Sequence, residues 1–212
     1  MITTNTKRLS MIACLAATAA LAASETNTGS GMIGVQGGTA IFVANTNVAA
    51  VGVTGKSTAL VARLSVRRLA EGLQLEHIDA RLSVKTLATG IGLADSHMRK
   101  YIFTTANGQV PDLQFEGANA TCSGSAKDTT CQVAGMLTIR GIARPFTLPL
   151  KIREDGAEFK ASGDGVVKLS AYGIKQPSEL GVKMTDDVQL HLDFAAKPVA
   201  GDVAMLAAGS RR

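Results

Sequence analysis

The sequence reads TGIGLADSHMRKYIF at residues 89–103 and GMLTIRGIARPFTL at residues 135–148. These two stretches are apolar and interrupted by glycines, and they contain one histidine and several basic residues but no set of nucleophile, base and acid. The segments around them alternate apolar and polar residues, a period of two that is typical of half-buried antiparallel strands. The pattern predicts a β-barrel or β-sandwich with an apolar interior.

The strand pattern is clearest between His77 and Lys85, where every second residue is apolar and the residues between are charged or polar. It stops between Ala94 and Phe103, where apolar residues recur at helical spacing after a candidate cap, Asp95-Ser96. We therefore expect an all-β fold, an extended antiparallel lipocalin-like β-barrel of about eight strands with a short helix. A sandwich with a filled core is the alternative.

Composition limits the classes of partner. The chain has 212 residues, 46% of them hydrophobic, which is enough for one domain with a buried core. Aromatic residues make up only 4% and Trp is absent, so the interior must be built from small and aliphatic side chains. Small interior side chains leave space inside the fold. The net charge of +5 comes from basic residues spread singly over the strands. A nucleic-acid groove needs clustered basic residues with stacking aromatics, so we expect no nucleic-acid partner.

The first residues have the features of an export signal. Lys7-Arg8 form a positive start, Leu9–Ala20 is apolar, and Ala20-Leu21-Ala22 is a small-x-small cleavage pattern. The apolar run is shorter than the ~20 residues of a spanning helix, so we expect a periplasmic or secreted protein without an integral membrane span. The expected segments are a signal peptide (1–22), a flexible N-terminal arm (23–38), the barrel (39–196) and a C-terminal tail (197–212).

Export also explains the cysteines. Loss of the leader removes Cys14 and leaves Cys122 and Cys131, an even pair in an oxidising compartment. They flank the polar, turn-like segment Ser123–Thr130, so a disulfide between them would link the base of a hairpin. A metal site is the competing interpretation, but two cysteines without a nearby histidine or second cysteine pair lack zinc-ligand spacing. We expect a disulfide and no metal.

The two opening stretches resemble the YceI-like family of polyisoprenoid- or lipid-binding bacterial proteins. Leu87-Ala88-Thr89-Gly90 leads into Asp95–Phe103, and Gly135–Pro145 resembles the family pattern G-x-L-T-I-x-G-x-x-R/K-P. The resemblance spans Thr39–Ala196. Many members carry histidines in an opening Asp-Pro-x-His-Ser element and in a Phe-x-Val-x-His strand, and Ile41–Val48 has neither. The resemblance implies an exported, extended antiparallel barrel that holds long apolar molecules such as isoprenoid quinones, polyprenols or fatty amides.

Inward-facing apolar residues are the candidate ligand contacts, because eight strands can enclose an elongated ligand when the interior side chains are small. The residues expected to line the barrel are Phe42, Leu64, Ile78, Leu82, Phe103, Leu137, Phe146, Leu148, Ala161, Gly163, Leu192 and Phe194. No catalytic residue is expected, since the chain has no Gly-x-Ser-x-Gly element. His97 and Met98 are conceivable haem ligands, but there is no CxxCH motif and neighbours on a helix point to different sides. We expect no cofactor.

These observations favour an exported binding or carrier protein, and not an enzyme, that holds a polyisoprenoid, isoprenoid quinone or similar lipid inside a β-barrel. Two alternatives stay open at this point. One is an envelope structural or interaction protein with a filled barrel, and the other is an enzyme acting on a lipid or quinone. A carrier would also have an envelope redox or lipid-handling partner. Neither the ligand nor the oligomeric state follows from the sequence.

Overall fold

A computed structural model describes residues 30–49, 51–69, 72–125, 127–179 and 181–199. The predicted signal peptide (1–22), the first part of the predicted arm (23–29) and most of the predicted tail (200–212) lie outside the described residues. Within the described ranges, no helix combines the length and the apolar character that crossing a membrane requires.

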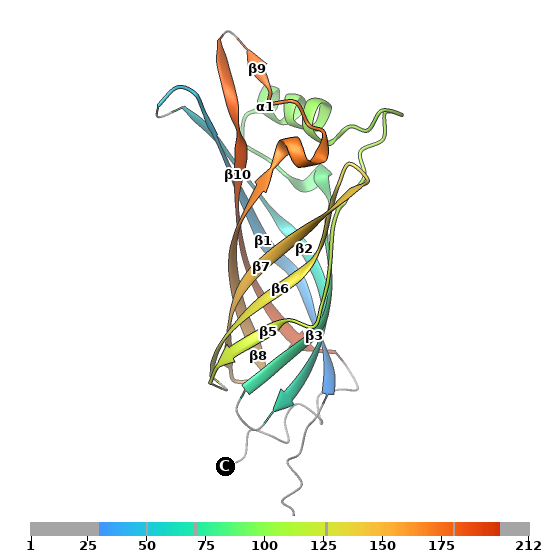
Figure 1. The fold of residues 1–212 in the computed structure, drawn as a ribbon, viewed down its shortest axis with the longest axis vertical. Coiled ribbons are helices and arrows are strands. Elements are labelled where there is room, and N and C mark those ends of the chain that lie inside the picture. The colour runs from blue at the N-terminus through green and yellow to red at the C-terminus, as the bar shows by residue number, and fades with distance from the viewer. Residues whose placement is uncertain (1–29, 50, 70–71, 126, 180, 200–212) are drawn as a thin grey trace, which may run out of the picture.

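Eight antiparallel strands form a closed barrel, tall and narrow in Figure 1. The order around the wall is β1-β2-β3-β4-β6-β7-β8-β10, and β10 pairs with β1 to close the ring. The strands of the ring are β1 (Ser30–Thr46), β2 (Gly52–Leu69), β3 (Gly72–Leu82), β4 (Leu113–Ala118), β6 (Asp128–Ile139), β7 (Ile142–Asp155), β8 (Glu158–Lys168) and β10 (Val182–Pro198). Two short strands are added to it, since β5 (Thr121–Gly124) pairs with β6 and β9 (Ser178–Glu179) pairs with β10. The predicted antiparallel barrel is confirmed, and closure excludes the sandwich.

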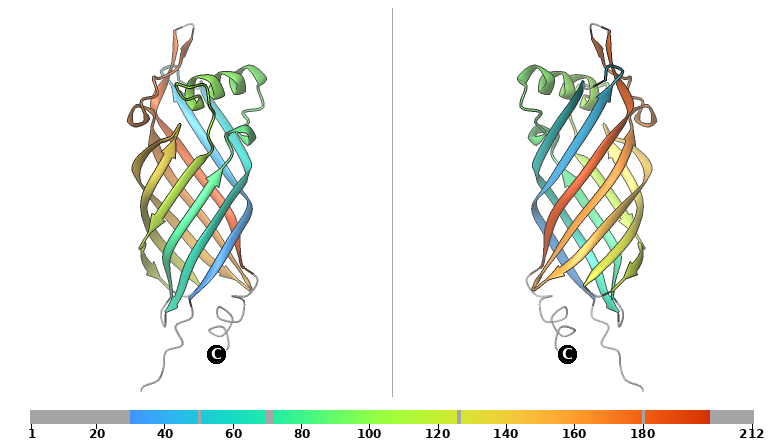
Figure 2. Two further views of the ribbon diagram at one scale, coloured as in Figure 1. Left: turned by 90° about the vertical axis from the view of Figure 1, so that its right-hand side faces the viewer. Right: turned by 90° about the vertical axis from the view of Figure 1, so that its left-hand side faces the viewer.

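A helical segment lies across one end of the barrel (Figures 1 and 2). It consists of α1 (Gly92–His97) and the π-helical turn η2 (Met98–Phe103), so the helix predicted over Ala94–Phe103 is confirmed. We call residues 92–103 the lid and the end that they cover the lid end. Two 3₁₀ turns lie at the same end, η1 (Val84–Thr86) and η3 (Leu169–Tyr172).

The predicted flexible arm (23–38) and tail (197–212) are wrong where the structure describes them. β1 begins at Ser30, so residues 30–38 belong to the barrel wall, and β10 continues to Pro198. Ile33 and Val35 are buried, and the glycines around them conceal this alternation in the sequence. Gly37 has φ +78°, a left-handed conformation that favours glycine, at an irregularity in the β1–β2 register. The glycines therefore form a bulge in a strand.

Two prolines lie in a strand that is unpaired along part of one side. Pro145 and Pro149 are in β7, which pairs with β6 along its whole length. On the other side, β7 pairs with β8 only between Leu150 and Asp155. A proline cannot donate a ladder hydrogen bond, so the prolines are tolerated where β7 has no partner on that side. The wall between β7 and β8 is therefore unpaired towards the lid end.

The opposite end of the barrel is closed by an ion pair between facing strands. Arg68 of β2 is buried, and its guanidinium donates two hydrogen bonds to the Glu154 carboxylate of β7, at 2.6 and 3.3 Å. The Arg68 Nε has no hydrogen-bond partner among the described residues. The paired side chains lie over apolar residues of the lumen, so we call this the closed end.

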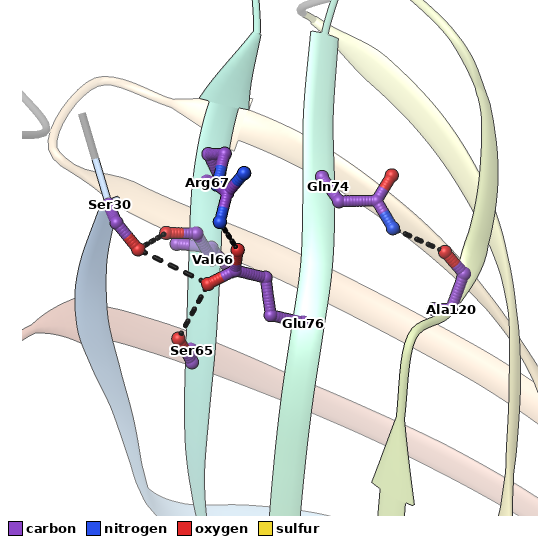
Figure 3. Close-up of polar contacts among 7 residues, drawn as sticks. All are labelled: Ser30, Ser65, Val66, Arg67, Gln74, Glu76 and Ala120. Carbon is purple, nitrogen blue, oxygen red and sulfur yellow. Dashed lines mark hydrogen bonds and ion pairs between the residues drawn. The ribbon is translucent and has the colours of Figure 1, made fainter. Parts of the chain in front are cut away.

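Polar side chains outside the barrel also tie strands together at the closed end (Figure 3). The Glu76 carboxylate of β3 accepts hydrogen bonds from the hydroxyls of Ser30 and Ser65, each at 3.2 Å, and forms an ion pair with Arg67. The Gln74 side-chain amide donates to the Ala120 carbonyl at 2.6 Å. Because these contacts join the start of β1, the end of β2 and the start of β3, they fix the register where the strands begin and end.

The predicted disulfide is present. Cys122 of β5 and Cys131 of β6 are directly opposite in the antiparallel pair and are bonded to each other. Cys131 is completely buried, whereas Ser125 and Lys127, between the two strands, are exposed. The bond therefore attaches the short strand β5 to the barrel wall.

We expect Arg68→Met to lower the free energy of unfolding by about 2–3 kcal/mol, because it leaves a largely buried carboxylate without its cation. The double variant Arg68→Met/Glu154→Leu should recover most of that loss, since both charges are then absent. Denaturant unfolding of both variants measures the two effects. If the double variant is as unstable as the single one, the loss of stability does not come from the unpaired Glu154 carboxylate.

Replacing both cysteines by serine should lower the free energy of unfolding by about 2–3 kcal/mol, the loop-closure value for a loop of this size. Thermal unfolding with and without reductant measures this loss. Thiol titration of the denatured, unreduced chain after removal of its leader should find no free thiol. Two titratable thiols would contradict the assignment.

Candidate functional site

An apolar cavity of about 110 Å³ lies inside the barrel at the lid end. Strands β1, β3, β4, β6, β8 and β10 contribute to its wall, together with η2, η3, Leu87 after η1 and Ile174 after η3. Its lining residues are Ala40, Ile41, Phe42, Ala44, Leu82, Leu87, Met98, Ile102, Phe103, Leu113, Leu137, Ile139, Val167, Leu169, Ile174, Met184, Val188 and Leu190. Every one of these side chains is apolar, and none is titratable.

This lining selects what can occupy the cavity. One water molecule needs ~10–15 Å³ of cavity volume and about two to four polar partners. The cavity has space for water but offers it no side-chain hydrogen-bond partner. A water molecule that enters the cavity would lose its hydrogen bonds to other water molecules. An apolar group has no hydrogen bonds to lose, and its transfer from water into the cavity is favourable. The cavity is therefore suited to hydrocarbon.

Two alanines of β1 create part of this space. Ala40 and Ala44 point inward and are 2% and 1% exposed. Between them Phe42 faces the same way and also lines the cavity. Ala40 lies opposite Leu192 of β10 in the ladder that closes the barrel. A larger side chain at position 40 or 44 would occupy the cavity.

The lid forms the roof of the cavity. Met98, Ile102 and Phe103 line it from η2. The lid is held by the Asp95 carboxylate, which accepts hydrogen bonds from the backbone N–H and the hydroxyl of Thr89 at 2.6 and 2.7 Å. These two hydrogen bonds, the backbone one foremost, lower the pKa of Asp95. Their contribution is therefore complete above about pH 4, the ordinary pKa range of Asp, and is lost as pH falls through the lowered pKa.

The turn η3 covers the unpaired wall between β7 and β8. The Arg144 Nε donates a hydrogen bond to the Ala171 carbonyl at 2.7 Å, so β7 holds the turn in place. From the other side, the Asp186 carboxylate accepts hydrogen bonds from the Ser170 hydroxyl and N–H, and both lower the pKa of Asp186. Tyr172, the last residue of the turn, is buried, and its burial raises the pKa of the phenol. Arg144, in the stretch 135–148, thus holds the turn that completes the cavity wall. In the stretch 89–103, the contact between Thr89 and Asp95 holds the roof of the cavity.

The lumen is packed towards the closed end. A space of only about 10 Å³ is left there, between strands β1, β2, β3, β7, β8 and β10. Its lining residues are Ile33, Leu64, Val66, Leu73, Leu75, Ile152, Phe159, Ala161, Phe194 and Ala196. The barrel therefore has a hollow lid end and a filled closed end.

The twelve residues predicted to line the barrel separate along this axis. Four of them line the cavity: Phe42, Leu82, Phe103 and Leu137. Three border the small closed-end space: Leu64, Ala161 and Phe194. The others belong to or pack against the apolar core without lining either space: Ile78, Phe146, Leu148, Gly163 and Leu192.

The small residues of β8 were expected to leave room for a ligand, and the structure gives two of them another role. A Cβ at Gly163 would lie 2.6 Å from the Pro149 carbonyl oxygen and 2.8 Å from a Leu150 methyl. A Cβ at Gly165 would lie 2.7 Å from the Phe146 ring. Their missing side chains are therefore replaced by neighbouring protein atoms. Phe146 in turn packs edge-on against Phe115, with ring centroids 6.2 Å apart.

Sequence reasoning missed the contributions of the lid and the loops. Met98 and Ile102 were on the predicted helix, and their helical spacing could have assigned them to its inner face. Leu169, Ile174 and Met184 lie in or near turns, where no periodic pattern marks an inward position.

The histidines are not arranged as a metal or catalytic site. His77 is exposed, and His191 contacts Asp164 on the outside of the wall, 2.7 Å from Nδ1 to Oδ1. His97 packs edge-on against Tyr101 within the lid. Across the described ranges, no group of three or more His, Cys, Asp or Glu residues is placed to hold a metal ion.

Solved structures with the same fold include three bacterial proteins. BcnA of Burkholderia cenocepacia is 18% identical with a TM-score of 0.59, and the match covers 76% of this chain and 96% of that one. A polyisoprenoid binding domain from Saccharophagus degradans, implicated in plant cell wall breakdown, is 15% identical with a TM-score of 0.57, covering 81% and 99%. The YCEI protein of Campylobacter jejuni is 18% identical with a TM-score of 0.57, covering 71% and 88%.

Sequence comparison agrees with this fold. Among curated proteins no sequence matches the chain. The family model of the YceI-like domain matches residues 25–196, a range that starts ahead of the expected boundary at Thr39 and includes all of β1. The chain belongs to the YceI-like domain family.

Proposed function

We propose that this chain is an exported binding protein that holds one end of a long apolar molecule in the cavity at the lid end. The observation that carries this proposal is the lining of that cavity, in which every side chain is apolar. The name of the Saccharophagus degradans domain supports the choice of ligand class, since that domain is described as polyisoprenoid binding. The candidate ligands are a polyisoprenoid, an isoprenoid quinone or a similar lipid.

The filled closed end limits how much of such a molecule is enclosed. The larger of the two spaces described in the lumen lies at the lid end, so the end of the chain enters there and the rest extends towards the lid. Each enclosed methylene contributes about 0.8 kcal/mol of gross transfer free energy, and ordering the chain offsets part of it. Without a polar anchor in the cavity, selectivity comes from the width and branching of the chain.

The cavity supports binding better than catalysis. General acid–base or nucleophilic catalysis needs a titratable or nucleophilic side chain within hydrogen-bond reach of the reacting atoms. None of the residues that line the cavity carries such a group. An apolar molecule held there is shielded from water and from reactive side chains, as suits storage or transfer.

Export to the periplasm or beyond is the second part of the proposal. Its support is the leader pattern around Lys7-Arg8 and Ala20-Leu21-Ala22, together with the disulfide between Cys122 and Cys131. Structural disulfides form and persist in oxidising compartments. N-terminal sequencing of the chain from fractionated cells tests this part directly, with Ala23 or a near neighbour expected as the first residue.

Ala40→Phe should remove bound lipid while the protein stays folded, because the added ring occupies the cavity. The matched control is Thr39→Phe, which adds the same ring to the outer face of β1. The measurement is native mass spectrometry of protein purified from its own envelope, followed by organic extraction. We expect a co-purifying apolar lipid in the parent and in Thr39→Phe, and much less in Ala40→Phe.

Two results would contradict the proposal. One is a parent protein that reproducibly carries no lipid and takes up none when a prenol is supplied, which would favour the interaction protein with a filled barrel. The other is equal lipid content in Ala40→Phe and Thr39→Phe, which would place the ligand outside the cavity. If Ala40→Phe does not fold, Ala44→Leu fills the same space with a smaller side chain.

Asp95→Ala should speed exchange of bound lipid without much change in the melting temperature, because it releases the lid from Thr89 and leaves the barrel ladder intact. Release of a fluorescent prenol analogue to acceptor vesicles measures the rate, and Asp112→Ala is the control at an exposed carboxylate without a hydrogen bond among the described residues. The parent should release faster as pH falls below about 4, and Asp95→Ala should lose part of this acid response. Part remains because Asp186, whose pKa is also lowered, holds η3. Exchange rates that are equal in all three proteins at neutral pH would show that the lid does not control access.

A further inference from the structure

The lid is apolar on both of its faces. Its inner face lines the cavity through Met98, Ile102 and Phe103. On its outer face and the turn before it, Ile91 and Leu93 are 65% and 67% exposed, the largest fractions among the exposed large hydrophobic residues of the described chain. Large apolar side chains that are exposed next to each other mark an interaction surface.

The turn between β1 and β2 lies at the same end of the barrel as the lid (Figures 1 and 2), and further apolar side chains are exposed there. Tyr101 of the lid is 50% exposed, and Val48 and Val51 in the turn between β1 and β2 are 42% and 45% exposed. Half of the exposed large hydrophobic residues of the described chain thus belong to the lid end, and the others are divided between the barrel wall and the closed end.

The two ends of the barrel also differ in how many of their basic side chains form ion pairs. At the closed end, Lys127 has no ion pair with a described carboxylate, and five other basic side chains are neutralised: Arg67–Glu76, Arg68–Glu154, Arg153–Asp128, Lys160–Asp155 and Lys197–Glu158. Towards the lid end, the ion pairs between described side chains are Lys168–Asp187 and Arg81–Asp79. These basic residues at the lid end have no ion pair with a described carboxylate: Lys85, Lys100, Arg140, Lys175 and Lys183.

Two carboxylates at the lid end are engaged within the protein, whereas Asp112, directly before β4, is exposed and has no hydrogen bond or ion pair among the described residues. Asp95 is held by Thr89, and Asp186 is held by Ser170. The surface of the lid end therefore combines exposed apolar side chains with basic side chains that have no ion pair. Lys100 illustrates the arrangement, since its ammonium lies 5.2 Å from the centroid of the exposed Tyr101 ring.

We propose that the lid end docks onto the surface of a membrane that contains anionic lipids, with Ile91, Leu93 and Tyr101 entering the interface and Lys85, Lys100, Lys175 and Lys183 facing the headgroups. This surface has the features that bind peripheral proteins to such membranes, a patch of large apolar side chains flanked by cations. The inference rests on the surface of the lid end, and it extends the proposed function by naming where the apolar ligand is taken up or delivered. Docked in this way, the roof of the cavity lies at the level from which an apolar chain would leave the bilayer.

Vesicle flotation of the lipid-free mature chain tests the docking directly. We expect binding to phosphatidylcholine vesicles that contain one quarter phosphatidylglycerol, much weaker binding to pure phosphatidylcholine, and release by high salt. Leu93→Ser and Lys100→Glu should each weaken binding to the anionic vesicles by roughly tenfold. The matched controls are Val166→Ser, at a 53% exposed residue of the barrel wall, and Lys151→Glu, at an exposed lysine of β7, and both should bind as the parent does.

A fluorescent reporter identifies the face that enters the interface. The chain contains no Trp, so Leu93→Trp places a single indole on the outer face of the lid. Its emission should shift to shorter wavelength when anionic vesicles are added, whereas the emission of Val166→Trp should not. These measurements use protein without a ligand, so their outcome is independent of whether the cavity binds lipid.

Three results would overturn the docking proposal. The first is absence of binding to the anionic vesicles at low salt. The second is equal loss of binding in the variants and in their controls, which would indicate attraction by net charge alone. The third is a dimer in sedimentation that Leu93→Ser dissociates while the vesicles bind neither protein, which would make a second copy of this chain the partner of the lid.

Discussion

The pairing of β1 with β10 is the constraint on which the rest of the structure depends. It joins the first and last strands of the chain in an antiparallel ladder that extends from Ile33–Pro198 to Thr46–Met184. Without it the sheet would have two long unpaired edges and a lumen open to water. With it, the backbone polar groups of β1 and β10 pair with each other, and the two strands enclose a largely apolar interior. The cavity depends on the same ladder, because Ala40 and Phe42 lie within it.

Within this closed wall, the interior is divided unequally. Towards the closed end, large aliphatic and aromatic side chains meet across the lumen, and the Arg68–Glu154 pair lies beyond them. Towards the lid end, β7 and β8 separate, and the wall is completed by η3, held by Arg144 and Asp186. If β7 and β8 were paired along their whole length, side chains of these strands would form the wall at the lid end. The irregular end therefore coincides with the open space, and side chains from turns and the lid form much of its lining.

The strands and the helix could be predicted from the sequence because each depends on local periodicity, whereas closure of the barrel depends on the pairing of β1 with β10 and left a sandwich as the alternative. Alternation between His77 and Lys85 marks β3, and its loss after Ala94 marks the lid. The disulfide followed from the even pair of cysteines about a polar turn. β1 was placed too late because its bulge needs glycines, which resemble a linker in composition.

The location of the cavity could not be predicted, because it depends on which side chains from distant strands meet. Ala161 and Ala40 are both inward-facing alanines, and their sequence contexts give no reason to separate them. In the structure, Ala161 faces the packed closed end, while Ala40 faces the cavity. Gly163 and Gly165 are small because β7 and Phe146 approach them closely, which is a packing requirement and not a ligand site. The apolar faces of the strands thus indicated an apolar interior, but the position of the cavity within it follows only from how the side chains pack in the structure.

The central claim is that an apolar chain occupies the lid end of the lumen and not the whole barrel. Photolabelling with a prenol analogue that carries a diazirine at the end of its chain tests this most directly, with the labelled positions mapped by mass spectrometry. The structure predicts label on lining residues such as Met98, Ile102, Met184 and Val188, with competition by unlabelled prenol. Label that is concentrated on closed-end residues such as Leu64 and Phe159, or that lies only on the outer wall, would contradict the claim.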